Sequence, residues 1–233
     1  MKIKILHLIE GAKQAEGLTV IIDVFRAFSL ECYLYAQGAE EIVPVGNIER
    51  AYEYKREDET CILAGERHGK KCEGFDFGNS PSAFRGIRLD GRKVIHTTSA
   101  GTQGVANAKR ADEIITGSLV NAKAVAEYIR RKNPDVVSLV CMGMEGTRLA
   151  EEDELCAQYI KSILEDQELE DIQARAEALK DGGGKHFFQP DNQEIYPEED
   201  FWMCIQCNRF PFVIRIFQSE GAMASEKLSI EGL

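Results

Sequence analysis

Short runs of β-branched and aliphatic residues alternate with segments of helical periodicity along most of this chain, and this alternation limits the fold more than any other feature. Strands are predicted at Leu18–Ile22, Ile42–Val45, Cys61–Ala64, Lys93–Thr97, Glu113–Thr116, Val136–Cys141 and Phe212–Ile216. Helices are predicted at Phe28–Gln37, Asn47–Glu57, Asn121–Lys132, Glu152–Asp166 and Leu169–Lys180. This order is typical of right-handed crossovers and a mostly parallel sheet covered by helices. We therefore predict the α/β class, with α/β/α layers and residues 1–233 in one compact unit.

Two regions give weaker signals. Pro44 indicates that its strand lies at an edge or ends there, because proline cannot donate to a strand ladder. Residues 185–217 are rich in aromatic side chains. The tail from Glu220 onward is predicted to be mobile.

Composition excludes several classes of partner. The chain has 233 residues, 44% of them hydrophobic, and a net charge of -11. The charge disfavours nucleic acid, whereas a local arginine cluster can still attract a small anion. No apolar run approaches the ~20 residues of a membrane-spanning helix, and the apolar stretch at the N-terminus is too short for a signal peptide. We expect a cytoplasmic protein without membrane or nucleic-acid partners, and a homo-oligomer is compatible with this reading.

The seven cysteines favour reduced thiols over a disulfide framework, because their number is odd and several lie within apolar runs. Cys204 and Cys207 form an isolated C-x-x-C pair. A structural zinc site needs further ligands at suitable spacing, and no second close cysteine pair exists. We interpret this pair as two reduced thiols.

Acids and arginines follow two of the predicted strands, where ligands of α/β proteins usually bind. Asp23 and Arg26 follow the first strand, and Glu66 and Arg67 follow the third. A carboxylate there can hold a hard cation, and an arginine can clamp an anion. The alternative for the first pair is that Asp23 caps the following helix and Arg26 is solvated.

Hydroxyl- and glycine-rich turns follow as well. Asn79 and Ser80 precede Pro81, and Thr98, Gly101 and Thr102 lie in a turn that opens a helical segment. Such turns bind phosphate through backbone N–H groups and hydroxyls, or they simply cap helices. Asp153 lies in an acidic first helical turn, which the helix dipole favours in any case. Taken together, the positions predict a pocket for phosphate and a metal ion.

The ordered set of these motifs resembles the 2-phosphosulfolactate phosphatase family from about Leu18 to about Leu164. The resemblance rests on Asp23–Ala27, Gly65–Arg67, Gly74–Pro81, Thr97–Thr102, Gly117–Asn121 and Glu152–Asp153. It implies a two-part α/β fold and a requirement for magnesium. The implied reaction is hydrolysis of 2-phospho-3-sulfolactate, which leads to coenzyme M in some organisms, or of a related small phosphorylated organic acid. Met142 and Met144 depart from the smaller residues expected in that loop.

Our hypothesis for the site assigns three roles. Asp23, Glu66 and Asp153 hold Mg²⁺, directly or through water. Arg26 and Arg67 clamp the phosphate or the acid groups of the substrate. Phosphate oxygens are held by Asn79, Ser80, Thr98, Gly101 and Thr102. Metal-activated water is preferred to a phospho-aspartate, because Phe25 stands where such phosphatases carry a second aspartate; His68 and His96 are candidates for proton transfer.

Two other functions remain open from the sequence. Val20–Phe25 also resembles the first strand of isochorismatase-like hydrolases, in which a strand-end cysteine is the nucleophile, and Cys141 has such a position. A non-catalytic phosphate-binding protein on the same scaffold is the other alternative.

Overall fold

One 10-stranded sheet runs through the computed structural model, which describes residues 1–219 and 222–230, in the order β1-β8-β2-β7-β9-β10-β3-β6-β4-β5. The strands are β1 (Lys2–His7), β2 (Gly17–Ile22), β3 (Glu41–Pro44), β4 (Ile62–Arg67), β5 (Lys70–Lys71), β6 (Lys93–Thr97), β7 (Ala111–Gly117), β8 (Val136–Cys141), β9 (Phe212–Ser219) and β10 (Ala222–Ser229). Strands β1, β8, β2 and β7 are parallel, as are β3, β6 and β4. The antiparallel hairpin β9–β10 joins the two groups. The mostly parallel sheet confirms the predicted fold class.

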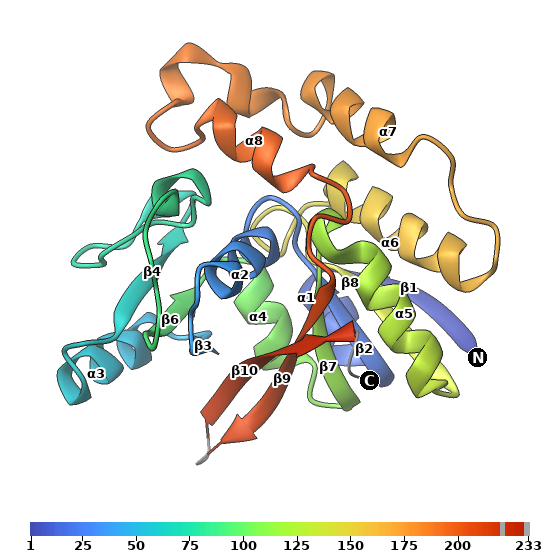
Figure 1. Ribbon diagram of the computed structural model, residues 1–233, viewed down its shortest axis with the longest axis horizontal. Coiled ribbons are helices and arrows are strands. Elements are labelled where there is room, and N and C mark those ends of the chain that lie inside the picture. Colours follow the sequence, from blue (N-terminus) through green and yellow to red (C-terminus); the bar gives the residue numbers. More distant parts are fainter. Residues whose placement is uncertain (220–221, 231–233) are drawn as a thin grey trace.

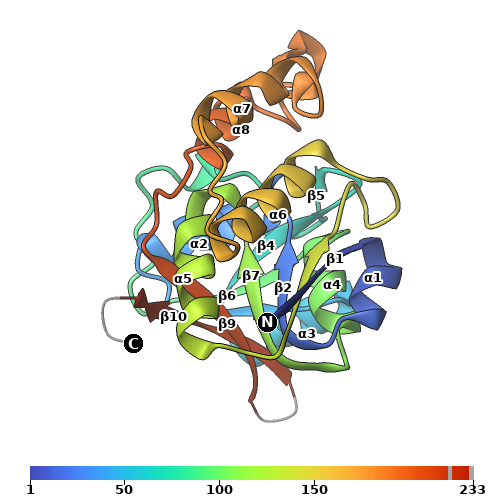
Figure 2. The same ribbon diagram turned by 90° about the vertical axis from the view of Figure 1, so that its right-hand side faces the viewer.

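Helices cover both faces of this sheet, as the layered prediction requires (Figures 1 and 2). They are α1 (Leu8–Gln14), α2 (Ala27–Ala36), α3 (Ile48–Glu57), α4 (Gly101–Asn107), α5 (Ala122–Lys132), α6 (Glu151–Leu164), α7 (Ile172–Ala178) and α8 (Glu198–Cys204). Helices α5 and α6 pack together on one face, and α1 and α4 on the other. Nearly all of α2 is buried, which is the expected state of a helix without a polar face.

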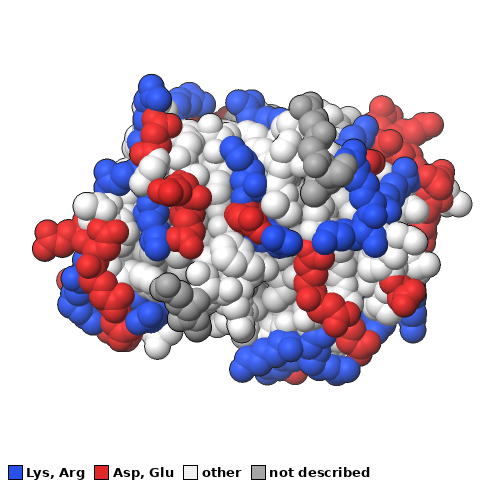
Figure 3. Space-filling view, turned by 60° about the horizontal axis from the view of Figure 1, so that its bottom comes forward, with Lys and Arg blue, Asp and Glu red and all other residues white. Residues whose placement is uncertain are grey.

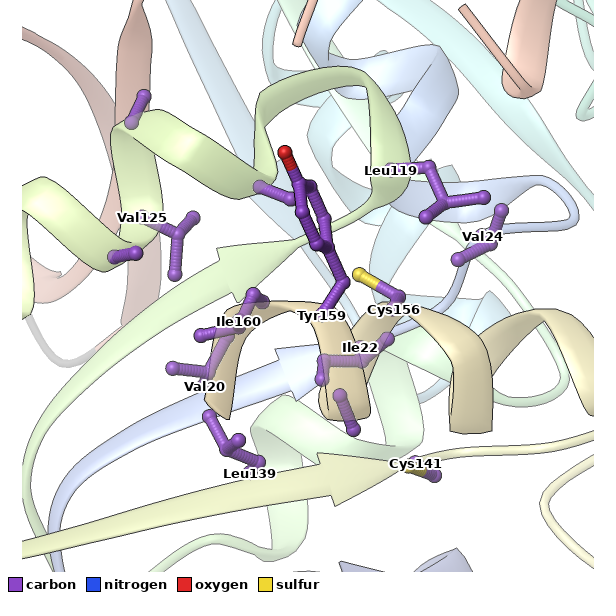
Figure 4. Close-up of a cluster of buried hydrophobic side chains, with 14 of the residues drawn as sticks. Val20, Ile22, Val24, Leu119, Val125, Leu139, Cys141, Cys156, Tyr159 and Ile160 are labelled. Carbon is purple, nitrogen blue, oxygen red and sulfur yellow. The ribbon is translucent and has the colours of Figure 1, made fainter. Parts of the chain in front are cut away.

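Strand β2 lies at the centre of the core and is buried at every position. Val20 and Ile22 point toward the layer of α5 and α6, where they meet Leu139 of β8 and Tyr159 of α6 (Figure 4). Ile21 points to the opposite layer and packs with α1 and α4. A strand covered on both faces needs an unbroken apolar run, and this is the pattern from which it was predicted.

Local signals placed several boundaries correctly. The Asn47 side chain accepts a hydrogen bond from the backbone N–H of Glu49 at 3.0 Å and caps α3. Pro44 is the last residue of β3, in agreement with a strand end. The expected mobile tail is wrong for Ala222–Ser229, because these residues pair with β9 as strand β10; the other tail residues, 220–221 and 231–233, lie outside the described residues.

The segment from α7 to α8 forms an arm over one edge of the sheet (Figures 1 and 2). This arm, residues 172–204, contains both helices and several short 3₁₀ turns. It lies above the carboxyl ends of the parallel strands, where the predicted site residues gather. The arrangement of the chain as one two-part unit stays a prediction.

The opposite side of the molecule, around the β9–β10 hairpin, carries charges of both signs (Figure 3). Lys and Arg side chains are interspersed there with Asp and Glu. Within the described residues, no helix combines the length and apolar character that crossing a membrane requires.

Candidate active site

A small cavity of about 60 Å³ lies where β2, β4 and β8 end and α6 begins, beneath the arm. It is lined by Asp23, Phe25, Arg26, Glu66, Gly69, Asn79, Ser99, Ala100, Gly143, Met144, Glu145, Glu152, Asp153, His186 and Tyr196. A single water needs roughly 10–15 Å³, so the cavity has room for an ion with a few waters. Arg26, Gly69 and Asn79 also line a wider cleft of about 720 Å³, which adds Lys70 and Lys71.

Asp23 lies at the centre of the acidic side of the cavity and is 6% exposed. Its Oδ1 atom accepts a hydrogen bond from the backbone N–H of Ala27 at 3.1 Å, so it supports the first turn of α2 while facing the cavity. A Cβ atom at Gly101 would come within 2.9 Å of Asp23 Oδ2, which explains the glycine there. Burial raises the pKa of Asp23 to about 6, and the nearby Glu66 carboxylate adds to this effect.

Two acids at the start of α6 face Asp23. Burial raises the pKa of Glu152 to about 7, with a further contribution from Asp23. Burial, Asp23 and Glu152 together raise the pKa of Asp153 well above its ordinary value. The Glu152 Oε2 atom is buried and has no hydrogen-bond partner. These carboxylates therefore share a buried environment in which desolvation and mutual repulsion favour the protonated forms.

Backbone N–H groups hold the carboxylates of Asp153 and Glu66 in place. Asp153 accepts from the N–H groups of Val24 and Gly143, each at 2.8 Å, and so ties the loop after β2 to the loop after β8. Glu66 accepts from the N–H groups of Ser99 at 2.6 Å and Gly69 at 2.7 Å. Each carboxylate oxygen has a second lone pair, so anchoring fixes the direction of these groups and leaves them able to accept again.

The oxygen donors of this group are of the type that a hard divalent cation takes, and their side chains would have to rotate to ligate one ion together. Oxygen ligands are the ones Mg²⁺ prefers, and a cation would relieve the repulsion that raises these pKa values. Glu152 was missing from the predicted metal ligands. The acidic run Glu151–Glu154 was visible in the sequence, but burial separates Glu152 and Asp153 from the exposed Glu151.

Arg26 is buried beside this acidic group, and the alternative of a solvated Arg26 is wrong because it is 3% exposed. Its Nη1 atom donates to Asp200 Oδ2 at 2.7 Å and to the Ile195 carbonyl at 2.9 Å. The guanidinium also lies over the Tyr196 ring, 5.0 Å from its centroid. These partners all come from the arm.

Asp200 links the arm to the turn that contains Ser80. Its Oδ1 atom accepts from the Ser80 hydroxyl and from the backbone N–H of Ser82, both at 2.9 Å. Asp200 is fully buried, and no sequence pattern distinguished it from its neighbours Glu198 and Glu199. The Ser80 hydroxyl thus contacts Asp200, and Ser80 lines the outer cleft rather than the inner cavity.

Some predicted anion contacts lie outside the inner cavity. Arg67 donates to the Thr97 hydroxyl at 2.8 Å and to the carbonyl oxygen of Glu66. Thr98 and Thr102 exchange hydrogen bonds, each hydroxyl accepting from the other's backbone N–H at 2.9 and 3.2 Å. Ser99 and Ala100, between them, line the cavity instead. The roles assigned to Arg67, Thr98 and Thr102 stay predictions.

A buried chain of polar groups positions Asn79. His96 contacts Glu31 Oε1 through Nδ1 at 2.8 Å and Asn79 Oδ1 through Nε2 at 3.2 Å. Both His96 and Glu31 are fully buried. Because the Asn79 carbonyl oxygen is held by His96, its amide NH₂ is left to donate toward the cavity. His68, by contrast, is on the surface beside Glu145.

The arm also contributes His186 and Tyr196, whose rings lie 4.6 Å apart. Burial lowers the pKa of His186, and the charge of Arg26 lowers it further. The only feature of the sequence that indicated this role of the arm was the aromatic content of residues 185–217. Neither residue was predicted as part of the site, because no local pattern places them near Asp23.

The cysteines lie away from the reacting groups. Cys141 is buried and does not line the cavity, and burial with the nearby Asp153 carboxylate raises the pKa of its thiol. Cys204 and Cys207 form no disulfide bond, and their interpretation as two reduced thiols rather than a zinc or redox site stays a prediction. Met142 packs into the core, whereas Met144 lines the cavity.

Comparison with known proteins decides the family. A family model described as 2-phosphosulpholactate phosphatase matches residues 3–218. The chain belongs to the 2-phosphosulpholactate phosphatase family. This confirms the resemblance seen in the sequence and extends it into the arm and the β9 strand.

Individual members of the 2-phosphosulpholactate phosphatase family agree. A probable 2-phosphosulfolactate phosphatase of Clostridium perfringens is 32% identical over 221 residues, which cover 87% of this chain and 87% of that protein. Another, from Carboxydothermus hydrogenoformans, is 40% identical over 168 residues, or 72% of this chain and 69% of that protein. The match to one from Caldicellulosiruptor saccharolyticus is 40% identical over 152 residues and spans 62% of that protein, less than two thirds of its length.

Proposed function

We propose that this protein is a Mg²⁺-dependent phosphatase that hydrolyses the phosphate monoester of 2-phospho-3-sulfolactate or of a related small phosphorylated acid. The observation that carries the proposal is a buried group of carboxylates opening into a cleft lined by cationic side chains. The names of the relatives support the same reaction.

The metal would be held by Asp23 and Glu152, with Glu66 and Asp153 contributing directly or through water. The Glu152 Oε2 atom without a hydrogen-bond partner supports its place in this set. When bound, the cation neutralises charge on the transferring group and lowers the pKa of a coordinated water.

The chain's own groups would bind and orient the substrate. The Arg26 guanidinium and the Asn79 amide line the same cavity as the carboxylates and would contact the phosphate. Lys70 and Lys71 are exposed in the outer cleft and would meet the carboxylate and sulfonate of the substrate. Arg26 and Asn79 would therefore bind the phosphate in the inner cavity, and Lys70 and Lys71 would bind the acid groups in the outer cleft.

Hydrolysis forms a bond from the water oxygen to phosphorus and breaks the bond from phosphorus to the ester oxygen. The products are inorganic phosphate and the free hydroxy acid, whose new hydroxyl needs a proton. We propose His186 as the donor, because it lines the cavity and comes from the arm. Its lowered pKa favours the neutral ring, so it would first take up the proton that the attacking water releases and then pass it to the ester oxygen. Replacing it should lower kcat by about 10²-fold or more for an alkyl phosphate.

The leaving group tests this role. His186→Gln should have a much smaller effect on nitrophenyl phosphate, whose leaving group needs no proton, than on 2-phospho-3-sulfolactate. Equal losses on both substrates, measured as kcat under saturating Mg²⁺, would show that His186 acts by packing alone.

Phosphate release tests the function itself. The full chain is assayed on 2-phospho-3-sulfolactate and on other phosphorylated two- and three-carbon acids, with Mg²⁺ and with a chelator. Asp23→Asn and Glu152→Gln should abolish Mg²⁺-dependent release, whereas Glu151→Gln, one residue away and outside the cavity, should not. Binding without release would favour the phosphate-binding alternative, and inactivation by thiol alkylation would favour a cysteine hydrolase.

A further inference from the structure

A second cluster of possible metal ligands lies behind the acidic cavity. It consists of His7, Cys141 and Glu154, whose ligand atoms all lie within 4.8 Å of one another. His7 Nε2 is 2.7 Å from Glu154 Oε1. None of the three residues lines the cavity described above.

The fold brings these residues together from three elements. His7 ends β1 and Cys141 ends β8, and the two are register partners in neighbouring parallel strands. Register partners project from the same face of a sheet. Helix α6 packs on β8, and Glu154 lies in its first turn. In Figure 4, Cys141 lies at the tip of β8, beside α6.

The polar atoms of this cluster lie against one another. Glu154 Oε1 is inaccessible to solvent and faces His7 Nε2 at 2.7 Å, without a hydrogen bond of proper geometry. The Cys141 thiol donates to the Asp153 carbonyl oxygen at 3.5 Å. A cation among the three side chains would bind the Glu154 oxygen that has no well-placed donor.

The donor types point to a particular class of cation. Nitrogen, sulfur and oxygen donors in one cluster suit Zn²⁺, whereas Mg²⁺ prefers oxygen alone. Zinc–ligand bonds of about 2.0 to 2.3 Å put neighbouring donors of a tetrahedral site about 3.3 to 3.7 Å apart, so small side-chain rotations suffice. The His7 side chain is 40% exposed and gives the ion a path from solvent.

We propose that His7, Cys141 and Glu154 bind Zn²⁺, with a water in the fourth position. The ion would join the edge strand β1 to β8 and to the first turn of α6. Asp153, the neighbour of Glu154, braces the loops of the acidic cavity through Val24 and Gly143. Zinc would therefore stabilise the first turn of α6, from which Asp153 braces the cavity, without binding in the cavity itself.

Cobalt binding reports the ligand set directly. The full chain is stripped with a chelator, returned to excess Mg²⁺ so that the oxygen-lined cavity is supplied, and titrated with Co²⁺. One equivalent should produce the near-ultraviolet charge-transfer band of a Co²⁺–thiolate bond, and Zn²⁺ should abolish the band. Competition with a chromophoric chelator then gives the Zn²⁺ affinity.

Matched variants decide the assignment. Cys141→Ser and His7→Asn should weaken Zn²⁺ binding by at least about 100-fold, more than the loss of a supporting partner around a metal site. Cys207→Ser and His68→Asn are the controls; His68 has a carboxylate neighbour at 3.0 Å, as His7 does, but belongs to no such cluster among the described residues. Both controls should bind Zn²⁺ like the unchanged protein.

Thermal unfolding gives a second readout, because an ion that binds the native state raises Tm. Zn²⁺ should raise the Tm of the unchanged protein and of both controls, but not that of His7→Asn, whose half-exposed side chain makes misfolding a lesser concern than at Cys141. Absence of the thiolate band, a band unaffected by His7→Asn, or Zn²⁺ binding lost in Asp23→Asn would each overturn the proposal.

Discussion

At the scale of single residues, Asp23 shows how the proposed activity and the stability of the fold oppose each other. Its ordinary pKa is 3.8, and the folded protein raises it to about 6. A carboxyl group with a raised pKa favours the folded state while it is protonated. Without a metal, its contribution is therefore lost as the pH rises from the ordinary value through about 6.

Asp23→Asn should consequently stabilise the metal-free protein at neutral pH. We expect the free energy of unfolding to rise by about 2 to 3 kcal/mol, because the substitution removes a buried charge whose desolvation outweighs its backbone hydrogen bonds. Urea unfolding in the presence of a chelator measures this. The gain should disappear below pH 3.8, where the aspartate is protonated in both states; a loss of stability at neutral pH would contradict the repulsion.

Glu31 provides a second test at this scale, through the position of Asn79. Glu31→Gln removes the charge that holds His96, so the Asn79 amide should lose its fixed direction. We expect kcat/KM to fall about tenfold, or about 1.4 kcal/mol, and inhibition by inorganic phosphate to weaken in parallel. Glu40→Gln, an exposed neighbour, is the control. Weaker stability with unchanged phosphate inhibition would show a purely structural role.

At the scale of elements, Asp200 is one of the side chains that couple the arm to the rest of the molecule. Asp200 of α8 accepts from Arg26, which precedes α2, and from the turn at Ser80 and Ser82. Its removal would leave the Arg26 guanidinium buried without its carboxylate. An element that both covers and positions the site should affect activity and stability together.

Asp200→Ala should therefore destabilise the protein by about 3 to 5 kcal/mol and should raise KM for the phosphorylated acid. Glu199→Gln is a matched change on the same helix turn, where the exposed carboxylate pairs with Arg85 on the surface; it should cost little. Thermal unfolding and initial rates on both variants measure the contrast. Similar effects of the two changes would show that the arm is not held by Asp200.

At the scale of the whole molecule, the β9–β10 hairpin connects two groups of parallel strands. Strand β10 meets β3 through a pairing of Ser225 with Ile42. The Ser225 hydroxyl donates to the Ile42 carbonyl oxygen at 2.8 Å and lies 2.7 Å from the Tyr35 hydroxyl. This junction is far from the cavity.

Ser225→Ala should lower the free energy of unfolding by about 1 to 2 kcal/mol, because buried partners lose a hydrogen bond. Ser229→Ala, at an exposed position of the same strand, should have almost no effect. Denaturant unfolding measures the stability, and KM should stay the same in both variants. A large change of KM in Ser225→Ala would show that the junction between β10 and β3 affects the geometry of the site.

Most of the parallel strands were predictable from short apolar runs, and β2 and β8 are the clearest because nearly every position in them is buried. Strand β10 was not, because Ala222–Ser229 contains no β-branched residue and has three consecutive polar residues, Ser225–Lys227. Its conformation comes from pairing with β9. Strand β1, with its alternating Lys2 and Lys4, was missed although it pairs with β8 along its length.

The site divides in the same way. Asp23 follows β2, Glu66 lies at the end of β4 and Asp153 in the first turn of α6. These ends meet at one edge of the sheet, so topology alone brings the three acids near one another. Asp200, His186 and Tyr196 come from the arm, and their approach to Arg26 depends on tertiary packing that no local pattern encodes. Glu152 was hidden within an acidic run, because helix rotation decides which of those acids is buried.

The place of β9 and β10 in the sheet has a consequence for synthesis of the protein. In space they lie between β7 and β3, but in the sequence they come after all of the strands β1 to β8. While the ribosome is still adding the earlier residues, the two groups of parallel strands have no bridge between them, and their inner edges are exposed. The sheet can close only after residues 212–229 have left the exit tunnel, so these residues complete a sheet whose other strands are made before them.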